Sequence, residues 1–202
     1  MERLKDNILG IYCGTDCFRV AVILPHAKQE VVVSGKTSDL LTLSAMELLQ
    51  KCNILPKEIT KIVVCVGPGS FTSSRVAVSF VKGFCCGLPK VKIVPFTTFD
   101  FLAFEKDFNA VLVPAFSDYV FVRNGTDYCA KYADSFDGKI VADAATFERW
   151  GKGTRVEPNS NFLVFVEHMS KQKSVKISDL APVYLRASQA EIEREKRNGN
   201  NA

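Results

Sequence analysis

The sequence predicts an α/β protein with two lobes, of which the first is larger and more regular. Short β-branched apolar runs alternate with longer segments of helical apolar spacing, the pattern of α/β proteins. The chain has 202 residues, enough for one large domain or two small lobes. Hydrophobic residues make up 47% and charged residues 24%, so a globular core can form.

The first part of the chain predicts the order strand–strand–strand–helix–strand–helix–strand. Leucines at near-helical spacing predict a helix over 38–52, and Pro56 ends it because proline disfavours helix before it. A second helix is predicted over 72–86. Apolar β-branched runs predict strands at 8–13, 18–24, 30–34, 62–66 and 91–94. This order matches the half-unit of actin-like ATPases, so we predict the actin-like (ASKHA) superfold with a βββαβα N-terminal lobe.

The second part predicts a smaller, degenerate lobe. Thr97 or Thr98 caps a short helix through Phe104, and Asn124-Gly125 forms a hairpin turn. The other predicted elements are strands at 110–113, 119–123, 128–132 and 140–141, helices at 144–150 and 162–169, and a loop at 151–158. We place the lobes at 1–95 and 96–186 and expect the polar tail 187–202 to be disordered. The sequence shows no internal repeat.

The most informative stretch is a turn between the predicted strand at 62–66 and the helix that follows. It reads Gly67-Pro68-Gly69-Ser70-Phe71-Thr72. Glycine permits a tight turn or close approach, and we expect a positive φ at Gly69. Ser70 or Thr72 can cap the helix. A helix N-terminus can also cradle a phosphate, but a Walker loop needs a lysine after its second glycine, and none is present here.

This stretch, with Arg75 and Lys82-Gly83 after it, resembles the signature of the TsaB (YeaZ) family. Pro182-Val183-Tyr184-Leu185-Arg186 is a second match, so the resemblance covers residues 7 to 186. Members of this family have the actin-like superfold and assist in making threonylcarbamoyladenosine (t6A) on tRNA. The resemblance implies an accessory subunit that binds the catalytic subunit TsaD, with the ATPase TsaE joining the complex. It implies contact with tRNA only through that complex and no cofactor of its own.

Two positions depart from the family pattern. Where the resemblance implies Asp-Thr after the first strand, Tyr12-Cys13 stands, and where it implies Asp-Ala-Arg, Pro114-Ala115-Phe116 stands. Without a carboxylate for magnesium, phosphoryl transfer loses its main electrostatic aid. We therefore predict no enzymatic activity. The alternative is a stand-alone actin-like enzyme that uses ATP, with Asp16 and Asp118 as the acids.

The two helices of the first lobe predict a partner-binding face. A helix that is apolar around most of its circumference is buried on more than one side. In TsaB-like proteins these helices bind TsaD or, in the free protein, a second copy of TsaB. The partner-binding residues predicted here are Leu41, Met46, Arg75, Val76, Ser79, Phe80 and Gly83. The alternative for the apolar residues is that they pack in the core, and the alternative for Arg75 is that its side chain is solvated.

Charge and cysteine content exclude other classes. The 26 basic and 22 acidic residues give a net charge of +4, without the concentrated basic stripe expected of a direct tRNA binder. Seven cysteines and two histidines show no metal-ligand spacing, which favours buried thiols over a zinc or redox site. Ser70 lacks an evident base, so a capping role is favoured over that of a nucleophile. We expect a cytoplasmic protein with no membrane span.

Overall fold

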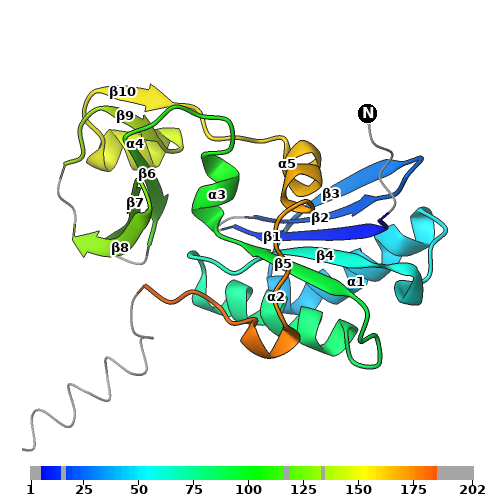
Figure 1. Ribbon diagram of the computed structural model, residues 1–202. Coiled ribbons are helices and arrows are strands. Elements are labelled where there is room, and N and C mark those ends of the chain that lie inside the picture. The colour runs from blue at the N-terminus through cyan, green and yellow to red at the C-terminus, as the bar shows by residue number, and fades with distance from the viewer. Residues whose placement is uncertain (1–5, 15–16, 116–118, 133–134, 186–202) are drawn as a thin grey trace, which may run out of the picture.

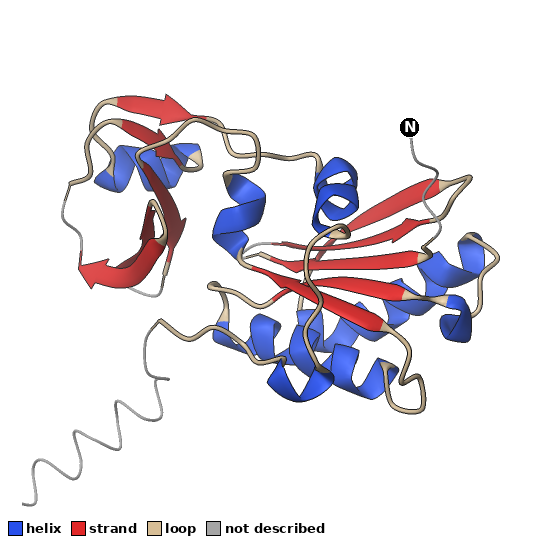
Figure 2. Ribbon diagram, viewed as in Figure 1, coloured by secondary structure: helices blue, strands red, loops and turns tan. Residues whose placement is uncertain are grey.

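The fold consists of two mixed five-stranded sheets with helices on both (Figures 1 and 2). A computed structural model describes residues 6–14, 17–115, 119–132 and 135–185. Its α/β class and its actin-like superfold confirm the fold predicted from the sequence. None of the helices in these ranges is long and apolar enough to cross a membrane.

The first sheet has the strand order β3-β2-β1-β4-β5. The three opening strands pair antiparallel, and β4 and β5 continue the sheet in parallel from β1. Helix α1 (Thr37–Lys51) and helix α2 (Phe71–Phe84) cover one face. The strands are β1 (Ile8–Cys13), β2 (Cys17–Ile23), β3 (Lys28–Ser34), β4 (Lys61–Cys65) and β5 (Lys92–Phe96), and a 3-10 turn η1 (Pro56–Glu58) precedes β4.

The second sheet is smaller and has the order β10-β9-β6-β7-β8. Helix α4 (Ala144–Trp150) packs on one face through Trp150, and α3 (Thr98–Leu102) packs on the other through Phe99. The strands are β6 (Ala110–Pro114), β7 (Tyr119–Asn124), β8 (Asp127–Tyr132), β9 (Lys139–Val141) and β10 (Thr154–Val156). β10 lies in the predicted loop 151–158, so that prediction was wrong: three residues become a strand only because they pair with β9.

The two sheets are built alike, which the sequence did not reveal. In each, three antiparallel strands open the unit, and the fourth and fifth strands add in parallel beside the first. The equivalence extends to an ion pair between an aspartate two or three residues before the first strand and the first residue of the fourth. Asp6 pairs with Lys61 at 2.7 Å in the first unit, and Asp107 pairs with Lys139 in the second.

In the residues that the structure describes, the second unit has no counterpart of α1. Residues 133–138 alone join β8 to β9, whereas the 15-residue α1 lies between β3 and β4. The helix after each sheet also contacts the other sheet: Phe99 of α3 packs on the second, and α5 (Phe162–Met169) packs on the first. The chain then runs through a last 3-10 turn, η2 (Ile177–Asp179), along the first sheet. The lobe boundaries proposed above stay a prediction.

Two different cores flank the first sheet. The face toward α1 and α2 is mostly aliphatic, with Leu9, Ile11, Val64 and Leu41 among its buried residues. The opposite face, toward α3 and α5, carries an aromatic cluster that we define as Tyr12, Phe96, Phe101, Phe162 and Phe165. Strands buried on both faces read as continuous apolar runs, which is why β1 and β4 were readily found in the sequence.

Candidate functional site

The glycine turn joins β4 to α2 and is tied to the start of α3. The Gly67 carbonyl accepts a hydrogen bond from the Thr98 backbone N–H at 2.8 Å. The Pro68 carbonyl accepts one from the Thr98 hydroxyl at 2.6 Å, and Thr98 is buried. A third bond, from the Val183 N–H to the Val66 carbonyl at 2.7 Å, fastens the C-terminal segment beside it. These contacts give the turn a structural role between three segments.

The conformational need for glycine lies at Gly67 and not at Gly69. Gly67 has φ +101°, and an added Cβ would lie 3.2 Å from the Val183 carbonyl oxygen. Gly69 has no positive φ, and its added Cβ would meet only the Cys13 carbonyl oxygen at 3.7 Å, an ordinary contact. The expectation of a positive φ at Gly69 was therefore wrong, because the chain takes up the positive φ two residues earlier, at Gly67.

Ser70 caps α2, as predicted from the sequence. Its hydroxyl accepts a hydrogen bond from the Ser73 backbone N–H at 3.4 Å, while Thr72 lies exposed within the helix. Phe71 stacks on Tyr184 with ring centroids 4.7 Å apart. The Arg75 guanidinium lies 4.5 Å from the centroid of the Phe71 ring, a cation–π contact that holds this exposed side chain against the helix start. Arg186, the last residue of the second family match, lies outside the described residues.

The predicted partner-binding residues divide into buried and accessible positions. Leu41 is 1% exposed and belongs to the core under α1, so it cannot contact a partner directly. Val76 and Phe80 are half-buried and pack against the same core. The accessible members of the predicted set are Met46 on α1 and Arg75, Ser79 and Gly83 on α2.

Leu43 is an accessible residue that the sequence analysis left out. It is 55% exposed on α1, three residues from Met46, which is 41% exposed. An added Cβ at Gly83 would meet no atom within 4 Å, so the helix surface there is open. The outer surfaces of α1 and α2, called the helix face below, thus offer two exposed apolar side chains beside small residues. The signal for Leu43 was its position opposite the buried stripe of α1.

The two positions that depart from the family pattern lie at equivalent places in the two sheets. Tyr12 and Cys13 end β1, and Pro114 ends β6 with Ala115 beyond it. Tyr12 is buried in the aromatic cluster, with its ring centroid 4.7 Å from that of Phe101. Pro114 and Ala115 are half-buried. Phe116, Asp118 and Asp16 lie outside the described residues, so the alternative acids cannot be placed.

The chemistry of the Tyr12 position is apolar. Burial raises the pKa of the Tyr12 phenol far above its ordinary value, so the ring stays neutral. Burial likewise raises the pKa of the Cys13 thiol, and the nearby Cys65 adds to this. Neither side chain supplies the anionic oxygen that a magnesium ion requires.

Cysteines and histidines form no ligand group in the part of the chain that the structure covers. No set of three or more Cys, His, Asp or Glu side chains lies close enough to hold a metal ion among these residues. Cys13, Cys65 and Cys85 are buried, and Cys86 and Cys129 are exposed, all as free thiols.

Comparison with known proteins bears on this arrangement. A family model described as TsaD, tRNA N6-adenosine threonylcarbamoyltransferase, matches residues 31–145. No match to the chain is found among curated proteins. In structure the chain is similar to YeaZ from Pseudomonas aeruginosa, with TM-score 0.72 and 16% identity over 89% of this chain and 100% of that one. It is also similar to a protein from the same organism described as uncharacterized with similarity to peptidase YEAZ, with TM-score 0.70 and 16% identity over 90% of this chain and 100% of that chain.

Proposed function

This chain belongs to the TsaD family, and we propose that it is a non-catalytic subunit within that family, of the TsaB (YeaZ) type. It binds a catalytic TsaD subunit and holds it active in the formation of t6A on tRNA. The helix face is the surface that binds TsaD. TsaE joins through the complex, and the free chain pairs with a second copy through the same face.

The observation that carries this proposal is the buried Tyr12. It occupies the position at which the family resemblance implies a carboxylate, at the end of β1. Phe96, Phe101 and Phe162 surround its ring at centroid distances of 6.5, 4.7 and 6.1 Å. A magnesium-bound phosphate needs charged oxygen ligands and water, and an aromatic cluster offers neither. A subunit that retains the fold without this group fits an accessory role.

The helix face supports binding of a protein partner. Leu43 and Met46 expose apolar surface, and Ser79 and Gly83 allow another chain to approach α2 closely. Arg75 adds a fixed cation, and arginine is enriched at interface hot spots. A specific complex on this face buries on the order of 1,000 Å² or more.

The test is co-purification with the TsaD subunit of the same organism. Leu43→Glu places a charge on the exposed apolar surface of α1, so it should abolish the complex. The free energy of unfolding should stay within about 0.5 kcal/mol of the wild-type value. Val164→Glu is the matched control, because Val164 is also exposed on a helix, at 43%, but lies on α5. This control should bind normally.

Two outcomes would overturn the proposal. One is failure of the unaltered chain to bind TsaD. The other is magnesium-dependent ATP hydrolysis by the purified chain alone, which would favour the stand-alone enzyme. If the Leu43 and Val164 variants bind TsaD equally well, the contact does not lie on the helix face, but the role as a subunit is not contradicted.

A further inference from the structure

Five lysines from two distant segments meet at the β5 edge of the first sheet. Two lie just before and within β5, and three lie in the segment after α5. All five are exposed, and none has an ion-pair partner among the described residues. We call them the lysine cluster: Lys90, Lys92, Lys171, Lys173 and Lys176.

Backbone contacts hold the two segments together. The Val175 N–H donates to the Ile93 carbonyl at 2.8 Å, and the two residues form an antiparallel bridge. In an antiparallel pair the residues flanking a bridge are opposite each other, which places Lys92 across from Lys176. Like charges directly opposite are destabilising. The Asp6 carboxylate, whose pKa is lowered first by the hydrogen bond from Lys61 and also by the charge of Lys92, relieves this pair only in part. The positive charge that remains is available to an external anion.

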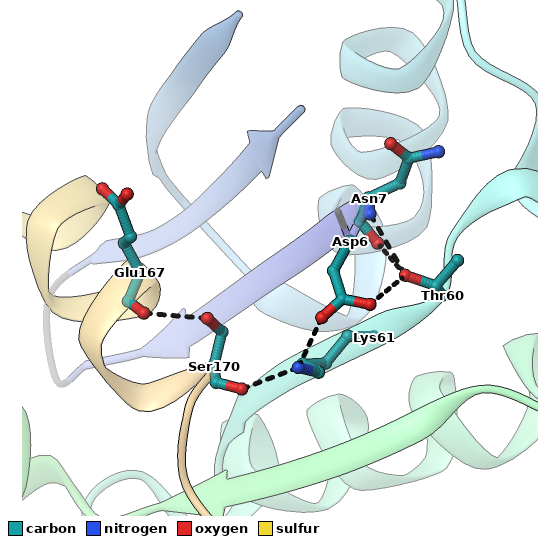
Figure 3. A network of polar contacts seen from close by, with 6 residues as sticks. All are labelled: Asp6, Asn7, Thr60, Lys61, Glu167 and Ser170. Carbon is teal, nitrogen blue, oxygen red and sulfur yellow. Dashed lines mark hydrogen bonds and ion pairs between the residues drawn. The ribbon is translucent and has the colours of Figure 1, made fainter. Parts of the chain in front are cut away.

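The start of the second segment is fixed as well. Figure 3 shows the Lys61 ammonium donating to the Ser170 carbonyl at 2.8 Å and to the Asp6 carboxylate at 2.7 Å. Lys171 and Lys173 therefore lie between two anchored points, Ser170 and Val175, at most about 17 Å of chain apart. Two acids lie near these lysines: Asp6, which accepts hydrogen bonds from Lys61 and Thr60, and Asp179, three residues after Lys176. They do not balance five lysines. The cluster keeps its net positive charge.

From this juxtaposition we infer that the β5 edge binds the phosphate backbone of RNA. Exposed lysines act as point charges for phosphates and carry no sequence preference. The inference rests on the proposed function in one respect: the choice of RNA as the polyanion, because the family model is that of an enzyme acting on tRNA. It goes beyond the expectation that tRNA is reached only through the complex. The site could not be recognised in the sequence because the two halves of the cluster are about eighty residues apart.

The test measures binding of a fluorescently labelled tRNA transcript to the full-length chain by anisotropy, across roughly 50 to 200 mM salt. The double variant Lys92→Gln/Lys176→Gln should weaken binding about tenfold and lower the slope of log K against log salt by about 2. The control Lys36→Gln/Lys152→Gln removes the same charge at two exposed lysines away from β5 and should change neither. A folding defect is excluded if the double variant is at least as stable as the wild type, as relief of like-charge repulsion predicts.

Equal affinity and equal salt slope for the two double variants would overturn the inference, as would absence of RNA binding by the wild type at low salt. A Lys92/Lys176 variant that loses the TsaD complex with unchanged RNA affinity would assign the cluster to an acidic protein surface instead, which also overturns it. The proposed function is judged separately, by whether the wild-type chain binds TsaD.

Discussion

The two five-stranded units share strand order and direction but differ in the length of their strands and helices. The first has strands of five to seven residues and two long helices, α1 and α2, of 15 and 14 residues. The second has two strands of three residues, a seven-residue α4, and only 133–138 in place of α1. The same topology therefore yields a helix face in one unit and none in the other.

The difference shows which features of a fold a degenerate unit keeps. The second unit keeps the strand pairing, the helix cap and the ion pair from the segment before its first strand to the start of its fourth. Its described residues include no long helix that could bind a partner. Pairing and capping are local contacts that a short unit can still make, whereas a binding face needs helices long enough to bury their inner side and still present an outer one.

The largest expected effect comes from placing an acid at the equivalent position of each unit. Tyr12→Asp puts a carboxylate into the aromatic cluster and removes a packed ring, so it should lower the free energy of unfolding by about 4 kcal/mol or more. Pro114→Asp, at the half-buried end of β6, should cost about 1 kcal/mol. Urea unfolding measures both. Similar losses would mean that the two strand ends are not as different as the burial of Tyr12 indicates.

The glycine turn gives the next effect, and it belongs to the first unit. Gly67→Ala should lower stability by about 1 to 3 kcal/mol, because a Cβ is strained at φ +101° and approaches the Val183 carbonyl. Gly69→Ala, two residues away, should change stability by less than about 1 kcal/mol. Thermal and urea unfolding compare the pair. A larger loss at Gly69 would contradict the assignment of the turn.

Removing the helix caps should have a smaller effect on stability. Here the loss should be larger in the second unit than in the first. Asp143, the cap of α4, accepts hydrogen bonds from the Thr146 N–H at 2.9 Å and the Thr146 hydroxyl at 2.6 Å. Ser70, the cap of α2, accepts one at 3.4 Å. Asp143→Ala should therefore cost about 1 to 2 kcal/mol and Ser70→Ala about 0.5 kcal/mol. The unfolding midpoint at unchanged m-value is the measurement, and a reversed order would show that cap geometry does not decide the cost.

The equivalent ion pairs give the smallest effect, and it depends on pH. The hydrogen bond from Lys61 lowers the pKa of Asp6 below its ordinary value. This carboxylate contributes stability above the unfolded-state pKa, and the contribution is lost as pH falls through the lower folded-state pKa. Asp6→Asn should cost less than about 1 kcal/mol at pH 7, because Asp6 is partly exposed, and nothing once the wild-type group is protonated.

Asp107→Asn is the control for the ion pair. The side chains of Asp107 and Lys139 are 83% and 55% exposed, so their pair should add little at any pH. Urea unfolding at neutral and acid pH gives both differences. A pH-dependent loss in the Asp107 variant as large as that in the Asp6 variant would show that burial does not separate the two pairs.

The sequence by itself determined the local elements and the superfold. Strands, helices, the Ser70 cap and the hairpin at Asn124-Gly125 depend on neighbours within a few residues, and the structure has them with ends shifted by one or two residues. The departure at Tyr12 was also visible, because one residue type replaces another at a fixed place after a strand.

The tertiary structure alone decided which predicted residues are accessible and which charges gather. Leu41 and Leu43 are equally apolar, yet packing buries one and exposes the other. The strand at 154–156, the repeat of the two units and the lysine cluster all arise from pairing between segments far apart in the chain. Local propensity carries no information on such pairings, since their stability comes from contacts that exist only after the chain has folded.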